Sequence, residues 1–239
     1  MEPTTIPIPC IDPHAWRPLW VSIEGINGVG KTSAARAAAS ALGEQCLLLD
    51  ELTDQTEDTL PGHVISALAA NGDVCLRTGH PIVETLALLA LKFHEAERFT
   101  NGYLAGFDAI IEDRGLDSVA VCQAAIVAAH YSEAEPQRLA RYVLSSARSW
   151  YRLPEATILL TGDRTACAQR FAERIGRTLT PSELAVVYQA EELYLDLAVD
   201  DPDRYTVLDT SGWSSQETAR AVEQTVLALI TEREAAHVA

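Results

Sequence analysis

The stretch Leu19-Trp-Val-Ser-Ile-Glu-Gly25-Ile-Asn-Gly-Val-Gly30-Lys31-Thr32 decides the fold of this chain. It joins the apolar run Leu19–Glu24 to the pattern G-x-x-x-x-G-K-[ST], and the alanine-rich stretch Thr32–Leu42 that follows predicts a helix. A strand, a glycine loop and a helix in this order are typical of a phosphate-binding P-loop, because backbone N–H groups and the helix N-terminus then point at negative charge. The sequence therefore predicts a P-loop NTPase fold.

Each polar residue of this loop has a predicted role. Lys31 is expected to reach the β- and γ-phosphates of ATP, and the Thr32 hydroxyl is expected to ligate Mg²⁺. The predicted phosphate-binding residues are Gly25, Asn27, Gly28, Val29, Gly30, Lys31 and Thr32. The motif alone does not separate a kinase from a GTPase or a motor ATPase.

The rest of the chain alternates short apolar runs with longer helix-like stretches, the order expected of an α/β protein. Four further strands are predicted at Cys46–Asp50, Ala109–Glu112, Ala156–Leu160 and Tyr205–Leu208. Helices are predicted at Val83–Phe93 and Val119–Ala129, both apolar almost all round and therefore expected to be buried. We expect a five-stranded parallel sheet with helices on both faces, formed by residues 19–239 behind a Pro-containing arm at residues 1–18.

Composition limits the function classes. With 34 acidic against 18 basic residues and no cluster of Lys or Arg, the chain repels polyanions, so we expect no nucleic-acid partner. A few basic residues in one cleft can still bind a small phosphate ligand. The five cysteines are scattered, which argues against zinc sites and disulfides. The N-terminus has neither a signal-peptide pattern nor a membrane helix, and we expect a cytoplasmic protein.

A second acidic site is predicted after the strand Ala109–Glu112. Asp113 follows this strand directly, where ligands of parallel sheets collect, and it is the better candidate for the Mg²⁺ shell. Glu112 stays open as the alternative, and either acid could instead cap the next helix or pair with Arg114. Arg114 itself suggests phosphate recognition, because a guanidinium offers forked donors to phosphate oxygens.

A set of arginines predicts a short lid at about residues 170–183. Arg170, Arg174 and Arg177 follow one another at spacings of four and three, so they share one face as far as the helix continues. Thr180-Pro-Ser-Glu183 reads as a capping box that opens a second helix. Two helices that meet at an arginine-rich turn form a plausible cover over a transferring phosphoryl group, and solvated surface arginines are the alternative.

The order of these motifs resembles the thymidylate kinase family of nucleoside monophosphate kinases, from about residue 19 to the end of the chain. Ile23-Glu-Gly25 before the P-loop is similar to the family's E-G-x-x-G-x-G-K-[ST]. Asp113-Arg-Gly-Leu-Asp-Ser118-Val-Ala-Val-Cys-Gln123 is similar to its D-R-Y-x-x-S-x-x-A-Y-Q. Pro154-Glu-Ala-Thr-Ile-Leu-Leu160 and Tyr205-Thr-Val-Leu-Asp209-Thr-Ser211 resemble two further family strands, the second with the loop that borders the adenine.

The resemblance implies transfer of the γ-phosphoryl group of ATP to dTMP or a related pyrimidine nucleotide, with Lys31 and Arg114 in the catalytic site. Gly28 stands where some members carry an arginine, so the catalytic arginine is expected from the lid, as Arg174 or Arg177, while Arg170 is expected at the ATP site. Catalysis would then consist of positioning and charge neutralisation.

Departures from the family lie on the acceptor side. Asn27 replaces an acid, and Gly115 and Cys122 replace two tyrosines. The stretch LLALKFHEAER lacks the family's arginine, with Phe93 and His94 nearest its place. Glu51 could be a general base, which leaves a nucleoside kinase as the alternative, and a nucleotide-hydrolysing switch protein is a third interpretation. A homodimer is a further expectation.

Overall fold

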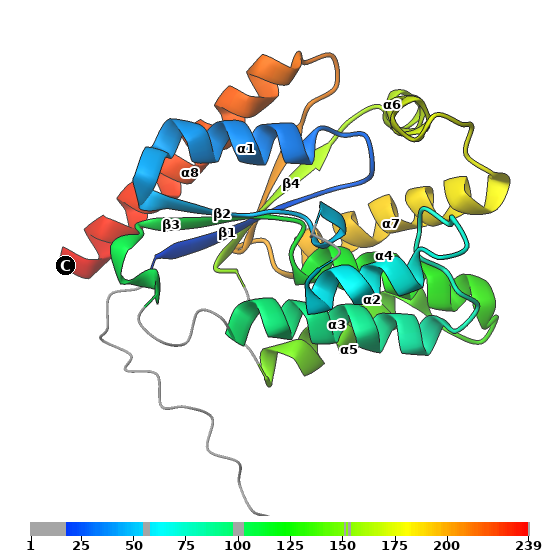
Figure 1. Cartoon of the computed structure of the whole chain (residues 1–239). Coiled ribbons are helices and arrows are strands. Elements are labelled where there is room, and N and C mark those ends of the chain that lie inside the picture. Colours follow the sequence, from blue (N-terminus) through cyan, green and yellow to red (C-terminus); the bar gives the residue numbers. More distant parts are fainter. Residues whose placement is uncertain (1–17, 55–57, 98–102, 151, 153, 239) are drawn as a thin grey trace, which may run out of the picture.

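A parallel five-stranded sheet forms the centre of the molecule. The computed structural model describes residues 18–54, 58–97, 103–150, 152 and 154–238, and the strand order is β2-β3-β1-β4-β5 with every neighbouring pair parallel (Figure 1). The strands are β1 Leu19–Glu24, β2 Cys46–Leu49, β3 Ala109–Asp113, β4 Ala156–Thr161 and β5 Tyr205–Asp209. The predicted α/β class and all five strands are thus confirmed to within one residue. The predicted arm at residues 1–18 lies outside the described residues except for Pro18.

Helices cover both faces of the sheet, as predicted. On one face α1 (Lys31–Leu42) packs against α8 (Ser215–Val238), and on the other α4 (Leu116–His130) contacts α3 (Pro81–Glu97), α5 (Pro136–Arg148) and α7 (Pro181–Asp200) (Figure 1). The short helix α2 (Leu60–Leu68) packs beside α3, and α6 (Arg164–Ile175) packs on α7. Short 3-10 turns span Gly43–Gln45, Leu52–Asp54 and Tyr103–Gly106. None of the described helices is long and apolar enough to cross a membrane.

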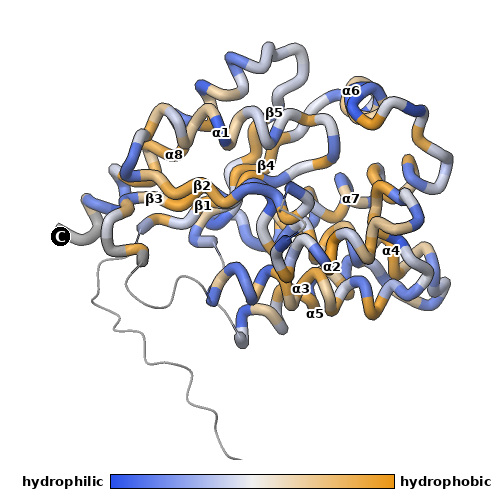
Figure 2. Tube along the Cα trace, in the orientation of Figure 1, coloured by the Kyte–Doolittle hydropathy of each residue, from blue (hydrophilic) through white to orange (hydrophobic). Residues whose placement is uncertain are grey.

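The core follows the apolar runs of the sequence. All six residues of β1 are buried because the strand lies in the middle of the sheet and is covered on both faces. Figure 2 shows apolar residues gathered along much of the sheet, as in β2 and β3. Helix α4 is buried from Leu116 to Val121 and again from Gln123 to Ile126, which confirms most of the predicted buried helix, but Val127 and Ala128 are only partly buried and Ala129 is exposed.

Helix α3 does not match its predicted burial. One face packs into the core, but Ile82, Val83 and Leu86 are 56%, 63% and 62% exposed. The prediction of a helix buried all round was therefore wrong for this segment. The reason is its place: α4 and α2 are the helices that pack most against α3, and no described helix covers its exposed side to a similar extent.

The two helices of the predicted lid are present, with one change at their junction. Helix α6 ends at Ile175 because Gly176 adopts a left-handed conformation (φ 71°), so Arg177 lies beyond the helix rather than on its face. The predicted capping box at the start of α7 is confirmed: Thr180 accepts a hydrogen bond from the Glu183 N–H, and the Glu183 side chain accepts one from the Thr180 N–H.

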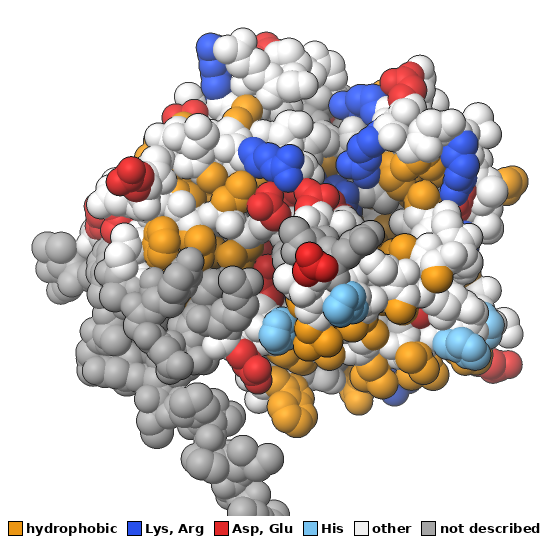
Figure 3. Space-filling model, in the orientation of Figure 1, with side chains coloured by type: hydrophobic (Ala, Val, Ile, Leu, Met, Phe, Trp, Pro, Cys, Tyr) orange, Lys and Arg blue, Asp and Glu red, His pale blue; other side chains and the backbone are white. Residues whose placement is uncertain are grey.

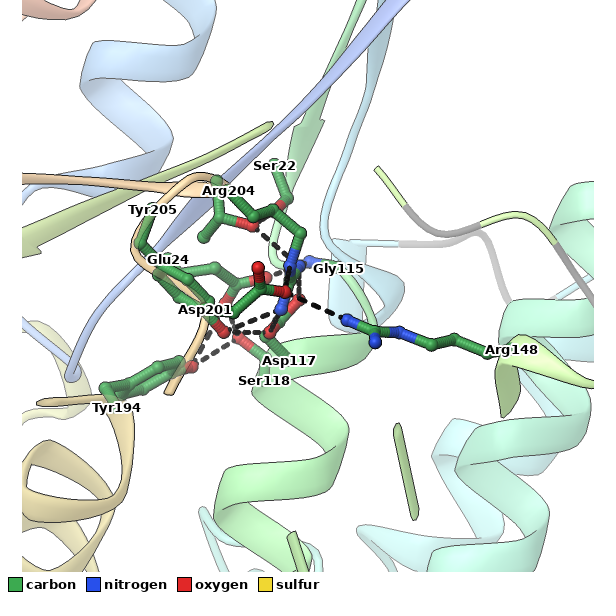
Figure 4. Close-up of polar contacts among 11 residues, drawn as sticks. Ser22, Glu24, Gly115, Asp117, Ser118, Arg148, Tyr194, Asp201, Arg204 and Tyr205 are labelled. Carbon is green, nitrogen blue, oxygen red and sulfur yellow. Dashed lines mark hydrogen bonds and ion pairs between the residues drawn. The ribbon is translucent and has the colours of Figure 1, made fainter. Parts of the chain in front are cut away.

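A buried ion pair ties α4 to the segment before β5. Asp117, which is fully buried in the first turn of α4, accepts bonds of 2.7 and 3.0 Å from Arg204, and Tyr205 donates to the same carboxylate (Figure 4). Arg204 also donates to Thr157 on β4 at 2.9 Å. Because two charges are removed from water together, each depends on the other for its stability.

We expect Arg204→Met to lower the free energy of unfolding by about 3–5 kcal/mol, because the buried Asp117 carboxylate then keeps its charge without a cation. Denaturant unfolding at neutral pH measures this loss, and adding Asp117→Asn to the variant should restore part of it by removing the charge. A loss below about 1 kcal/mol for Arg204→Met would contradict the assigned role of the pair.

Candidate functional site

The P-loop lies between β1 and α1 with three glycines at positive φ. Gly25, Gly28 and Gly30 have φ of 135°, 83° and 107°. A Cβ on Gly25 would meet the Leu160 carbonyl oxygen at 2.3 Å, so this position accepts only glycine. Helix α1 begins at Lys31 with Gly30 as its N-cap and without a side-chain cap, which leaves its first N–H groups available to an anion.

Helix α6 lies directly against the P-loop at Gly28. A Cβ on this residue would stand 2.0 Å from the carbonyl oxygen of Cys167 and 3.2 Å from the nitrogen of Phe171. Only a glycine lets the two backbones approach so closely. The helix that carries the predicted lid arginines is therefore in contact with the loop predicted to bind phosphate.

Lys31 is held inside its own loop. Its Nζ donates to the carbonyl oxygens of Gly25 and Ile26, both at 2.8 Å, and the residue is 3% exposed. Burial, reinforced by the positive charge of Arg114, lowers the pKa of Lys31 to about 7. An anion bound beside the ammonium would favour its charged form.

The two acids at the end of β3 point to opposite sides of the sheet, because successive side chains of a strand alternate. Glu112 accepts bonds from Lys92 of α3 at 2.7 Å and from the Trp20 indole at 2.9 Å. Both carboxylate oxygens of Asp113, in contrast, are buried without a well-formed hydrogen bond from any residue that the structure describes. Burial raises the pKa of Asp113, and the Thr32 hydroxyl opposes that shift from close by. Asp113 thus has free acceptor oxygens beside the P-loop threonine.

Arg114 is placed between the P-loop and a cavity by an unusual backbone. Its φ is 66°, in the left-handed region, which costs a non-glycine residue about 1–3 kcal/mol. Its Nη2 donates to the Asn27 side chain at 2.6 Å, and its Nε lies 2.9 Å from Glu51. Strain of this kind persists only where the surrounding structure fixes it, and it is concentrated at functional sites.

A cavity of about 440 Å³ opens next to the P-loop on the side of α3 and α4. Its volume is typical of small-molecule sites, and most of its wall is apolar. The predicted site residues that line it are Gly25, Asn27, Glu51, Arg114 and Arg174. The structure therefore brings the acceptor-side candidates together, while Gly28–Thr32, Asp113, Arg170 and Arg177 lie outside its lining.

The three lid arginines have different surroundings, on the side of the molecule where Figure 3 shows basic side chains gathered. Arg174 lines the cavity with its guanidinium over the Phe171 ring at 5.1 Å. Arg177 binds both carboxylate oxygens of Glu183, at 2.6 and 2.9 Å, and this pairing lowers the pKa of Glu183 to about 2. Arg170 donates to the Ala166 carbonyl and the Cys167 sulfur.

Most of the lining residues were not among the predicted site residues, and three of them with polar side chains are Lys92, Ser118 and Tyr194. Lys92 and Leu88 line the cavity from α3, whereas Phe93 and His94 do not, and Lys92 is paired with Glu112 and Glu95. A single lysine in an apolar helix was the available signal. Ser118 was quoted only as part of a motif, and Tyr194 on α7 gives no local signal.

The site combines three features: a glycine loop before an uncapped helix, a buried acid with free oxygens beside the P-loop threonine, and an adjacent cavity that contains arginines. This combination suits a protein that holds a nucleoside triphosphate next to a second substrate. The fold and the site define the class of P-loop phosphotransferases. Within this class, residues 23–221 match the thymidylate kinase family, and the chain belongs to that family. It is therefore a nucleoside monophosphate kinase, as the sequence resemblance implied, and the family uses ATP as its phosphate donor.

Known thymidylate kinases are similar to this chain in sequence and in fold. A "probable thymidylate kinase" of Methanosarcina acetivorans is 22% identical over 208 residues, which cover 87% of this chain and 94% of that protein. The thymidylate kinase of Bifidobacterium longum subsp. infantis is 26% identical over 218 residues, or 90% of this chain and 88% of that protein. The solved thymidylate kinase of Candida albicans superposes with a TM-score of 0.65 at 17% identity, covering 89% of this chain and 92% of that one. A thymidylate kinase of Ehrlichia chaffeensis gives 0.61 at 16% identity, with 89% and 99% covered.

We expect Arg174→Ala to lower kcat by about 10²- to 10³-fold with little change in the KM for ATP, because this guanidinium faces the cavity beside the P-loop. Arg177→Ala should lower kcat much less, since Arg177 is committed to Glu183. Steady-state kinetics of both variants measure the difference, with thermal unfolding to detect the loss of the Arg177–Glu183 pair. A larger kcat loss in Arg177→Ala would reverse this assignment.

Proposed function

We propose that this protein transfers the γ-phosphoryl group of ATP to a pyrimidine nucleoside monophosphate, with dTMP as the preferred acceptor. The observation that carries the proposal is the place of Arg114, whose guanidinium lines the cavity and bonds to the P-loop residue Asn27 at 2.6 Å. A cation between the two substrate sites suits an acceptor that carries a phosphate. The thymidylate kinases among its relatives supply dTMP as the acceptor to test first.

On the donor side, the residues fit Mg-ATP. The uncapped N-terminus of α1 and the glycines at positive φ suit the triphosphate, and Lys31 would exchange its two carbonyl partners for phosphate oxygens. Thr32 and Asp113 would hold Mg²⁺, because the free oxygens of Asp113 are the ligand type that this ion prefers. The ion, when bound, neutralises charge on the phosphates. Arg170, on α6 beside the loop, stays a proposed ATP contact.

On the acceptor side, the residues position rather than react. Arg114 orients the acceptor phosphate, and Arg174 approaches from α6 to neutralise charge as the phosphoryl group moves between the substrates. The apolar lining takes the sugar and base. An acceptor phosphate is already a nucleophile, so this scheme needs no general base.

The nucleoside kinase alternative depends on Glu51. Its carboxylate does line the cavity, as a base for a sugar hydroxyl would have to. Its Oε1 is, however, bound to Arg114 at 2.9 Å, which supports a role in holding the arginine. We therefore favour a monophosphate acceptor. Cytoplasmic localisation and a homodimer stay predictions.

The proposal is tested by turnover with ATP and Mg²⁺ against a panel of nucleosides and nucleoside monophosphates. We expect dTMP or a related pyrimidine monophosphate to be the best acceptor. Lys31→Ala should abolish transfer, with a loss well above tenfold and an intact fold by circular dichroism, because the lysine neutralises charge that develops during transfer. Turnover restricted to free nucleosides would overturn the proposed acceptor class, and activity of Lys31→Ala within tenfold of wild type would refute the P-loop assignment.

We expect Glu51→Gln to lower kcat only severalfold, because Glu51 contributes an ion pair to Arg114 while the hydrogen bond from Arg114 to Asn27 remains. If Glu51 were a general base, its replacement would instead lower kcat by about 10²- to 10⁴-fold. Initial rates at saturating ATP and dTMP distinguish these outcomes. Asp50→Asn is the matched control, because it removes a carboxylate from the same loop at an exposed ion pair with Arg36. A large loss in Glu51→Gln alone would favour the nucleoside kinase.

A further inference from the structure

Glu24 is a fully buried carboxyl group that the proposed phosphoryl transfer leaves without a role. It is the last residue of β1 and directly precedes the P-loop, yet its side chain points to the β3–α4 turn and to α7 (Figure 4). It accepts a hydrogen bond from the Gly115 N–H at 2.7 Å. Among the described residues it forms no ion pair, which is unusual because a buried carboxylate ordinarily requires a cation.

The hydrogen bonds around Glu24 explain how it is buried without a cation. Its Oε2 lies 2.5 Å from the Ser118 hydroxyl and 3.0 Å from the Tyr194 hydroxyl, and these two hydroxyls are 2.8 Å apart. Three oxygens in a closed triangle need three hydrogens, and the two hydroxyls supply only two. If Glu24 were ionised, two of the three oxygens would face each other with no hydrogen between them. A proton on Oε2 supplies the missing hydrogen, so that all three contacts are hydrogen bonds.

The surroundings favour the same protonated form. Burial and then the charge of Asp117 raise the pKa of Glu24 to about 7, with a lesser contribution from Glu112, and the hydrogen bonds from Ser118 and Gly115 oppose this shift. The charge of Asp117 is itself compensated by Arg204, and that of Glu112 by Lys92. The titratable groups that interact with Glu24 from the neighbouring elements are Lys31, Glu112, Asp117, Cys122, Tyr194 and Tyr205.

Each contact of Glu24 is to a residue that lines the acceptor cavity or is next in sequence to one. Ser118 and Tyr194 line it. The N–H of Gly115 belongs to the residue after Arg114, so its bond to Glu24 helps to hold Arg114 at its positive φ, together with the bond of the Arg114 N–H to the Ile23 carbonyl at 3.2 Å. One side chain thus joins the start of the P-loop to the turn, the arginine and two wall residues.

We propose that Glu24, in its protonated form, is a positioning residue that fixes Arg114, Ser118 and Tyr194 for the acceptor. This inference rests on the proposed function, since it assigns Glu24 to the binding of the acceptor monophosphate. Loss of the proton leaves the triangle one hydrogen short and places an unpaired charge in the wall. The hydroxyls then separate, and acceptor binding weakens more than ATP binding.

Kinetics of Glu24→Gln and Glu24→Ala between pH 6 and pH 8.5 test the positioning role. A glutamine amide cannot ionise, and its –NH₂ group can donate to both hydroxyls so that all three contacts stay hydrogen-bonded. The KM of Glu24→Gln for dTMP should therefore match wild type at pH 6 and stay low at pH 8.5, where that of wild type rises severalfold. Glu24→Ala should raise the KM for dTMP about tenfold or more at every pH, the loss expected for buried polar groups left without partners, with the KM for ATP nearly unchanged. Glu191→Gln, which removes a mostly buried carboxylate from the same helix as Tyr194, is the control and should follow the wild-type profile.

A second measurement reports the proton without turnover. The infrared difference spectrum between wild type and Glu24→Gln should contain the carbonyl band of a protonated carboxyl group at pH 6. The stability of wild type should also fall relative to Glu24→Gln as the pH rises from 4.5 to about 7, because the folded state keeps a proton that the unfolded chain has lost.

The outcomes separate the two proposals. If Glu24→Gln is impaired like Glu24→Ala, or if the infrared band is missing, the protonated positioning role is overturned while dTMP turnover by wild type keeps the proposed function. If wild type does not turn over any monophosphate, the proposed function fails and the positioning role fails with it, whatever the infrared spectrum shows.

Discussion

The parallel register of β1 and β3 is the constraint on which the site depends. Ser22 pairs with Glu112 and Ile23 with Asp113, so the two strands end at the same level of the sheet. The P-loop leaves one strand end and the Asp113–Gly115 turn leaves the other, which brings the lysine, the free acid and Arg114 to one edge. A shift of the pairing by one residue would turn Asp113 to the face where Lys92 binds Glu112 and would dismantle the site.

This site also shows how an acidic chain places buried cationic side chains where an anionic substrate can bind. Lys92 lies between Glu112 and Glu95, and Arg114 lies between Glu51 and Asn27. Internal carboxylates allow these cations to be buried before a substrate arrives, since an unpaired buried charge is costly. An incoming phosphate must then compete with groups of the protein itself. Recognition is therefore decided by geometry in the cavity rather than by the field of the whole molecule, which is negative.

Much of the fold could be predicted from sequence because its signals are local. An apolar run followed by a glycine loop defines β1 and the P-loop, and Thr180 with Glu183 defines the start of α7 within four residues. The position of Lys31 at the start of α1 was predictable because a motif specifies it. Glu24 and Tyr194, in contrast, are 170 positions apart, and only the folded chain shows that they touch. The exposure of Ile82, Val83 and Leu86 was also not predictable, because it depends on which neighbours α3 has rather than on its own residues.

The close approach of α6 to Gly28 has an evolutionary consequence. An arginine at this position would require the backbone at Cys167 to move away, since even a Cβ would overlap its carbonyl oxygen. In this backbone a P-loop arginine and an α6 packed on the loop exclude each other. Evolution from a catalytic arginine on α6 to one in the P-loop would therefore require more than a single substitution. The backbone of α6 would also have to move away from the loop.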